Sequence, residues 1–302
     1  MKVTQCVEAY LDHRHECGYE CASAAKLLRR FARFHGKLNI SLVADHHLDD
    51  FLSRAAATSG NAWQSYSGHL RRFFAFWFVR RQVKRIPKPK LKGGVVRIFY
   101  PHIYARAEIR KLLDATAAPL PRCRVGRETL KTIILLLYGT GIKFPDALAL
   151  LDTDVDLTNA TIRVGHSSAF KSRVIPIGRD VKRLLKRHLH SNERNRFGPG
   201  LPLFLTKKGT GVQHSGFWRT FRRLRRIAKV ERSDGGYQPR IYDLRHTFAV
   251  HSIVHWNRKG VELDKMLPLL AAYLGNLDFL GMQRYVALSP CSFQSQLERL
   301  KI

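Results

Sequence analysis

Acidic residues are scarce in this sequence of 302 amino acids, where 53 lysines and arginines stand against 23 aspartates and glutamates. The resulting formal net charge of +30 opposes compaction unless a polyanion neutralises it. Hydrophobic residues make up 45% of the chain and charged residues 25%, as in ordinary globular proteins. A mostly disordered chain, a collagen and a coiled-coil rod are therefore excluded. The charge predicts a nucleic acid as the leading partner and an anionic membrane surface as the second.

Long apolar runs are also missing. The longest, residues 132–138, is far shorter than the roughly 18 residues that a membrane helix requires. The N-terminal segment 1–16 carries acidic residues early and lacks the apolar core of a signal peptide. We therefore expect a soluble intracellular protein with no membrane partner.

Cysteines are few, and their number is odd: Cys6, Cys17, Cys21, Cys123 and Cys291. Cys17 and Cys21 are one helical turn apart and near two histidines, but a metal site would need further ligands at suitable spacing. Thiols in a reducing compartment are the plainer interpretation. A glycine-rich phosphate-binding loop of the nucleotide-binding kind is absent too.

Residues 1–86 are predicted to form a helical domain. In segments 24–34 and 65–83 the apolar residues recur at helical spacing, which indicates a packed core and not base stacking. The next segment, 84–94, holds two prolines, two glycines and several cations but no acid, so it cannot continue a helix. We place a basic linker at 87–98 and a second domain at 99–302.

The second domain is predicted to be mixed, which makes the fold class mainly α with a small β-sheet (α+β). Residues 156–164 indicate a turn and a strand, and residues 173–177 its partner, with a hairpin loop between them. Asp243 is the expected cap of a helix that ends at Trp256. Further helices are predicted at 105–116, 130–138, 145–151, 180–189, 215–230 and 267–274.

Four segments together resemble the tyrosine recombinase (phage integrase) family. Residues 138–151 (YGTGIKFPDALALL) resemble its first box, and 170–177 (FKSRVIPI) its β-hairpin. Residues 243–251 (DLRHTFAVH) resemble the second box, and 270–276 (LAAYLGN), followed by Tyr285, the third box and the nucleophile. The first domain is similar to the family's helical core-binding domain in type only.

The resemblance implies strand cleavage and rejoining of DNA through a 3′-phosphotyrosine, without metal or cofactor. Tyr285 stands at the nucleophile and Arg245 at the second of two phosphate-binding arginines. The other four positions depart from the family. Lys143 stands at the first arginine, Ser168 at the hairpin lysine, Tyr242 at the second-box histidine and Asn276 at the third-box histidine.

These departures weaken the implied chemistry. Lys143 keeps a charge but loses the bidentate fork, which costs about two to three decades in rate in an oxyanion-type site. Ser168 cannot act as a general acid near neutrality, and Lys171 replaces it only if the hairpin shifts its register. A phenol titrates near 10, so Tyr242 handles protons poorly at pH 7.

We therefore expect a DNA-binding recombinase or integrase, acting in site-specific recombination with weak or lost cleavage, in the bacterial cytoplasm on the nucleoid. A non-catalytic accessory partner of active recombinases is the alternative, and an RNA-binding protein a remote one. The family implies a homo-tetramer on DNA or a hetero-oligomer with other recombinases. Twelve cations are candidate DNA contacts: Arg71, Arg72, Lys84, Arg85, Lys88, Lys90, Lys92, Arg173, Arg219, Arg222, Arg223 and Arg226.

Overall fold

Apolar residues at helical spacing produce the helices of the first unit, Met1–Ile98, in the computed structural model. The structure describes residues 1–19, 22–55, 60–90, 100–121, 123–165, 172–191, 194, 197–234, 236–275, 285, 286 and 288. Helices α1 and α2 are followed by a 3₁₀ turn, η1, and by α3 and α4. Their bounds are Val3–Glu16, Ala22–His35, Ile40–Leu42, Asp45–Ala55 and Gly60–Val79.

The core of this unit confirms that Phe73, Phe74 and Trp77 of α4 pack inside, whereas Phe78 is 45% exposed. Phe73 and Phe74 are fully buried and meet Tyr10 and Phe31 edge to face. Phe34 differs from the predicted apolar face, because 46% of its surface is exposed and the Arg54 guanidinium lies over its ring. The buried face of α2 therefore ends at Phe31, one turn before the last apolar residue of the sequence pattern.

The basic segment after α4 is fastened to α3. Arg85 Nη1 lies 2.9 and 3.0 Å from the two carboxylate oxygens of Asp45. The backbone N–H groups of Lys88 and Lys90 donate to Asp45 and Asp49. Residues up to Lys90 are thus anchored to the first unit.

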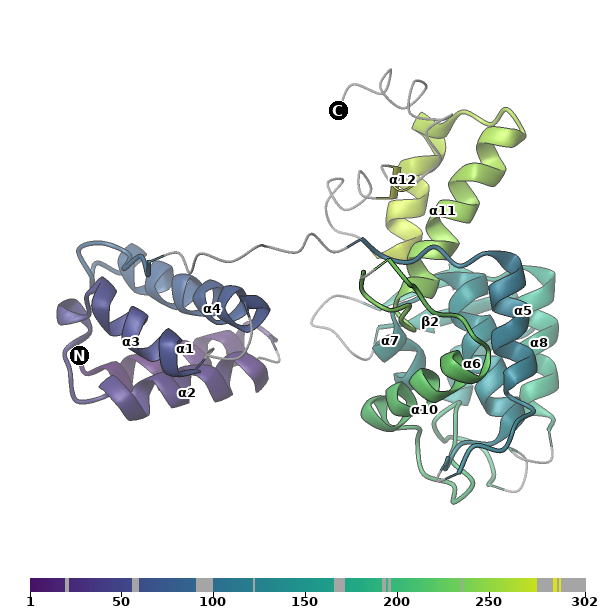
Figure 1. Ribbon diagram of the computed structural model, residues 1–302, viewed down its shortest axis with the longest axis horizontal. Helices are drawn as coiled ribbons and strands as arrows, with labels where there is room; N and C mark the ends of the chain where they lie inside the picture. Colours follow the sequence, from purple (N-terminus) through teal and green to yellow (C-terminus); the bar gives the residue numbers. More distant parts are fainter. Residues whose placement is uncertain are drawn as a thin grey trace. The chain divides into compact units, whose positions relative to one another are not determined.

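The second unit, Phe99–Ile302, is built around α6, Arg127–Thr140, most of whose apolar side chains are buried. Helices α8 and α11 pack on α6, and α10 packs on α5 (Figure 1). The bounds are Arg106–Ala115 for α5, Phe144–Ala149 for α7, Arg179–Leu189 for α8, His214–Ile227 for α10 and Asp243–Arg258 for α11. The apolar run from Ile133 to Leu137 is what a helix packed between other helices requires.

A small antiparallel sheet confirms the predicted fold class. Strands β2, Thr161–Val164, and β3, Arg173–Pro176, pair with Ile162 opposite Ile175. A short third strand, β1, Val155–Asp156, pairs with β2 where the sequence predicts only a turn, and it follows the 3₁₀ turn η2, Asp152–Asp154. Buried Ile162 and Ile175 attach the sheet to the main core.

Two helices complete the described part of this unit, and they pack against each other (Figure 1). Helix α12, Leu263–Leu274, begins earlier than the sequence predicts, with Pro268 inside it. The expectation that Asp243 caps α11 is wrong. Tyr242 is the N-cap, and the Asp243 carboxylate accepts the backbone N–H and the guanidinium of Arg240. Among the described residues, no helix combines the length and apolarity needed to cross a bilayer.

Candidate active site

The first box forms a sharp turn between two helices. Gly141 ends α6 with φ +60°, and a Cβ at this position would lie 2.4 Å from the Phe248 ring. Only glycine satisfies both the left-handed backbone and the close approach. The turn places Lys143 at the N-cap of α7, with Pro145 in the first turn of that helix.

Three of the predicted site residues line one pocket of about 260 Å³. Lys143 enters it from the first box, and Tyr242 and Arg245 enter it from the start of α11. The remaining walls are apolar: Leu137, Ile142, Phe144, Pro145 and Ile241. The pocket wall is therefore mostly apolar, with two cationic side chains among the lining residues.

Arg245 connects the first and third boxes. Its Nη1 donates to the carbonyl oxygen of Gly141 at 2.8 Å, and its Nη2 to that of Leu274 at 2.9 Å. A guanidinium has five N–H donors, so these bonds orient the group and leave its charge in place. The helix ends of α6 and α12 thereby fix the direction of Arg245.

Arg173 of β3 meets the same helix end. Its Nε and Nη2 donate to the carbonyls of Tyr273 and Leu274, each at 3.3 Å, and its Nη2 lies 3.9 Å from the buried Asp146 carboxylate. Burial lowers the pKa of the guanidinium, Asp146 opposes this change, and the charge of Arg245 adds to it. Arg173, expected as a DNA contact, therefore holds the hairpin to the first and third boxes.

Tyr242 is the centre of a second contact group. Its hydroxyl forms a short hydrogen bond with Nε2 of His214, the first residue of α10. The Phe144 ring lies 5.0 Å from the His214 ring and 5.7 Å from that of Tyr242, between centroids. Burial raises the pKa of Tyr242, so its hydroxyl stays protonated at neutral pH.

Tyr285 packs beside α11 and is only 5% exposed. Its ring centroid lies 5.5 Å from that of His246, the residue after Arg245. It shares an apolar cluster with Ala249 and Ile253 of α11 and with Leu267 and Leu270 of α12. Tyr285, the expected nucleophile, therefore packs against α11, the helix that carries Arg245, the expected phosphate-binding arginine.

Several predicted site residues lie outside the described residues: Ser168, Lys171 and Asn276 of the catalytic set, and Lys92 of the DNA contacts. Sequence reasoning missed His214 and Asp146. Asp146 was visible as an acid in the first box, but its partner Arg173 is distant in sequence. Nothing in the sequence connects His214 with Tyr242.

Most of the residues predicted to contact DNA have exposed side chains, as a side chain that reaches DNA requires. In the first unit these are Arg71, Arg72, Lys84, Arg85, Lys88 and Lys90, and in the second Arg219, Arg222, Arg223 and Arg226. Some are engaged: Arg222 lies over the Trp218 ring, and Arg223 donates to the carbonyl of Pro121. Neighbouring Arg225 is buried and donates to the Pro239 carbonyl and to Glu231.

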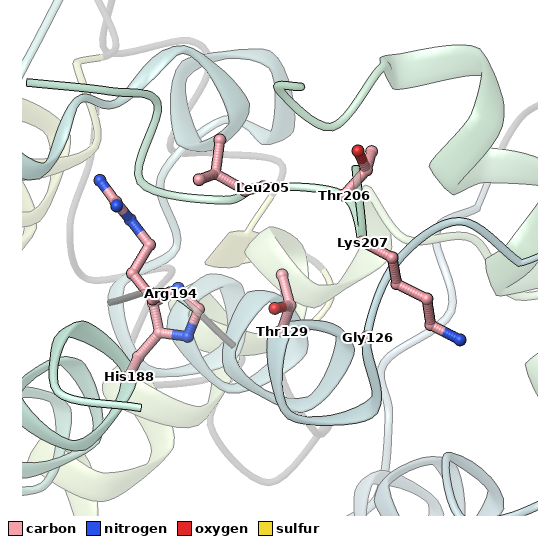
Figure 2. A pocket seen from close by; sticks show the side chains of 7 residues that line it. All are labelled: Gly126, Thr129, His188, Arg194, Leu205, Thr206 and Lys207. Atoms are coloured by element: carbon pink, nitrogen blue, oxygen red, sulfur yellow. The ribbon is translucent and has the colours of Figure 1, made fainter. Parts of the chain in front are cut away.

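A separate pocket of about 290 Å³ lies beside the start of α6 (Figure 2). None of the predicted catalytic residues lines it. Its two charged ends, on Arg194 and Lys207, point away from each other (Figure 2). Arg194 is buried and paired with Asp152 at 2.7 Å. This pocket therefore does not bring two cations together as the pocket of Lys143 and Arg245 does.

Comparison with known proteins decides the family. The model of the phage integrase family matches residues 104–271, more than half of the chain. The chain belongs to the phage integrase family. This integrase family member is 30% identical over 289 residues to the putative integrase/recombinase y4rE of Sinorhizobium fredii, covering 93% of this chain and 90% of the relative. It is 28% identical to the tyrosine recombinase XerC of a Roseiflexus species, covering 87% and 84%.

Solved structures show the same fold for this integrase family member. The Tn1549 transposon integrase in complex with transposon right end DNA aligns with a TM-score of 0.72 at 17% identity and full coverage of both chains. A lambda integrase dimer bound to a COC′ core site aligns with a TM-score of 0.65 at 14% identity, covering 94% and 95%. The predicted family and fold class are confirmed.

Proposed function

We propose that this integrase family member binds duplex DNA and acts in site-specific DNA recombination, with strand cleavage through Tyr285 that is weak or lost. The observation that carries the proposal is the pocket in which Lys143, Tyr242 and Arg245 meet. These residues come from the first and second boxes, and a backbone phosphate is the ligand whose charge and donor needs they match. The structural relatives bound to DNA support the same partner.

The reaction proposed for Tyr285 is a transfer of the phosphoryl group. Its phenol oxygen forms a bond to phosphorus while the bond from phosphorus to the 5′-oxygen of the DNA breaks. The phenol gives up its proton, and the 5′-oxygen takes one. Arg245 and Lys143 stabilise the negative charge on the non-bridging oxygens.

Two features explain why cleavage is slow under this proposal. Lys143 offers one ammonium in place of a planar fork, so one of two paired contacts to the phosphate is lost. Tyr285 is 5% exposed, and its side chain must leave the cluster of α11 and α12 to meet a phosphate. Opening that cluster adds an unfavourable equilibrium before the chemical step.

The second candidate is a non-catalytic DNA-binding partner of active recombinases. The departures at Lys143 and Tyr242 and the burial of Tyr285 favour it. Such a partner would occupy recombination sites alone, as a homo-tetramer, or in a hetero-oligomer. Both candidates predict DNA binding, so only cleavage separates them.

The test begins with selection of bound sequences from a pool of duplexes with a randomised centre. Bound sequences are rebuilt as nicked suicide duplexes, and a denaturing gel is used to find a covalent adduct. An adduct that disappears in Tyr285→Phe supports the recombinase, and binding without an adduct supports the accessory role. Equal affinity for duplex RNA, or no dependence on salt, would overturn DNA binding as the function.

A further inference from the structure

We infer that His214 is a positioning residue of the phosphate site, which acts through the hydroxyl of Tyr242. The inference rests on the proposed function, because it assumes a phosphate in the pocket of Lys143, Tyr242 and Arg245. It assigns a role to a histidine outside the three boxes and the hairpin. In the family's second box a histidine stands where this chain has Tyr242, and His214 of α10 places an imidazole against the Tyr242 hydroxyl.

The placement of the pair supports this role. His214 is the first residue of α10 and is exposed, whereas Tyr242, the N-cap of α11, lines the pocket. The hydrogen bond between Nε2 of His214 and the Tyr242 hydroxyl joins the two elements. The Phe144 ring packs on both side chains and limits their rotation.

The state of the imidazole decides where the Tyr242 proton points. A neutral His214 accepts the hydroxyl proton at Nε2 and carries its own hydrogen on Nδ1. A protonated His214 carries hydrogens on both nitrogens, so Nε2 donates to the Tyr242 oxygen. The hydroxyl must then donate elsewhere, and the pocket that it lines offers a phosphate oxygen. One proton enters from solvent, and no bond between heavy atoms changes.

Cationic side chains lie close to the pair. Lys143 lies at the N-cap of α7 next to Phe144, and Arg240 and Arg245 flank Tyr242 at the start of α11. The carboxylates of these two helices are engaged elsewhere, Asp146 with Arg173 and Asp243 with Arg240. A bound phosphate supplies the negative charge that a protonated His214 needs, so binding and protonation reinforce each other.

The experiment compares the pH dependence of DNA binding and of adduct formation for the full chain and its variants. The probe is a nicked duplex taken from the selected pool. His214→Gln keeps a hydrogen-bonding side chain that does not titrate, and Tyr242→Phe removes the hydroxyl. His255→Gln changes an exposed histidine at the far end of α11 and is the matched control.

As the pH falls from about 8 to 6, the DNA affinity or the adduct rate is expected to rise about tenfold more in the wild type than in His214→Gln. His255→Gln is expected to behave as the wild type does. Tyr242→Phe loses the same gain, and the double variant loses nothing more. Tyr242→His in the His214→Gln background restores the pH dependence, because it returns the imidazole to the pocket itself. Thermal melting of every variant checks that the fold is kept.

The failures can be told apart. Identical pH profiles for wild type and His214→Gln overturn the role of His214 and leave the proposed function intact. A wild type that binds but forms no adduct at any pH removes strand cleavage, while the binding profile still decides the role of His214. A wild type that binds no duplex overturns the proposed function and this inference together.

Discussion

Arg173 and Arg245 both donate a hydrogen bond to the carbonyl oxygen of Leu274, from Nη2 in each case, at 3.3 and 2.9 Å. Two guanidiniums at one oxygen repel each other. Further acceptors that bind the two groups offset this repulsion. Gly141 and Tyr273 contribute carbonyls, and Asp146 contributes a carboxylate at 3.9 Å. The end of α12 is therefore where the hairpin, the first box and the second box are held together.

Gly275 provides the first prediction. It has φ +70°, and a Cβ there would lie 2.7 Å from Cζ of Arg173. Gly275→Ala is expected to lower the free energy of unfolding by about 1–2 kcal/mol, because the left-handed backbone is costly and Arg173 must move. Chemical denaturation measures the change.

Gly216→Ala is the matched control, because this position is inside α10 with open space around it. Alanine there is expected to raise stability by about 0.5–1 kcal/mol. Equal effects of the two substitutions would contradict the special role of Gly275.

Lys143→Arg restores the planar fork at the N-cap of α7. We expect single-turnover cleavage of a nicked suicide duplex to rise by about tenfold or more, because a guanidinium donates two bonds to the phosphate. Lys143→Met removes the charge and should lower cleavage in the same assay. A decrease with arginine would show that the pocket is shaped for the ammonium.

Salt dependence distinguishes two arginines of the first unit. Both are exposed, but Arg85 is also bound by the Asp45 carboxylate. Arg71→Gln is expected to reduce the slope of log K against log salt by about 1, as the loss of one phosphate contact requires. Arg85→Gln should reduce it less. Fluorescence anisotropy across a salt series measures both, and equal slopes for the two variants would count against the prediction.

His251 makes stability depend on pH. Burial and then the charge of Arg106 lower its pKa, and its Nδ1 lies 3.2 Å from the Tyr138 hydroxyl. The unfolded chain therefore binds the proton more readily, so the free energy of unfolding falls as the pH drops through about 6.5. Burial lowers the pKa of His35 and of His69 in the same direction.

His251→Gln is therefore expected to flatten the fall of the melting temperature between about pH 7 and 5. His255→Gln, at an exposed position of the same helix, should leave the slope unchanged. A wild-type slope in both variants would show that the burial of His251 does not couple its protonation to folding.

Local sequence patterns predicted most of the elements and the family. The apolar spacing of α2 and α4, the glycines of the boxes and the alternation of β2 depend on neighbouring residues, so they are legible in the chain. These patterns predicted the structure less well where a residue distant in sequence determines whether a side chain is buried or a strand forms. Phe34 stays half exposed under the Arg54 guanidinium, and β1 forms because β2 offers it an edge.

The sequence by itself determined the excess of positive charge, the mainly helical fold, and the identity of the residues in the three boxes and the hairpin. Only the tertiary structure decided how these residues meet. It brought Lys143, Tyr242 and Arg245 to one pocket, turned Arg173 inward to Asp146 and paired Tyr242 with His214. The physical reason is that a hydrogen bond depends on a few ångströms in space, and the separation of two residues along the chain does not set that distance.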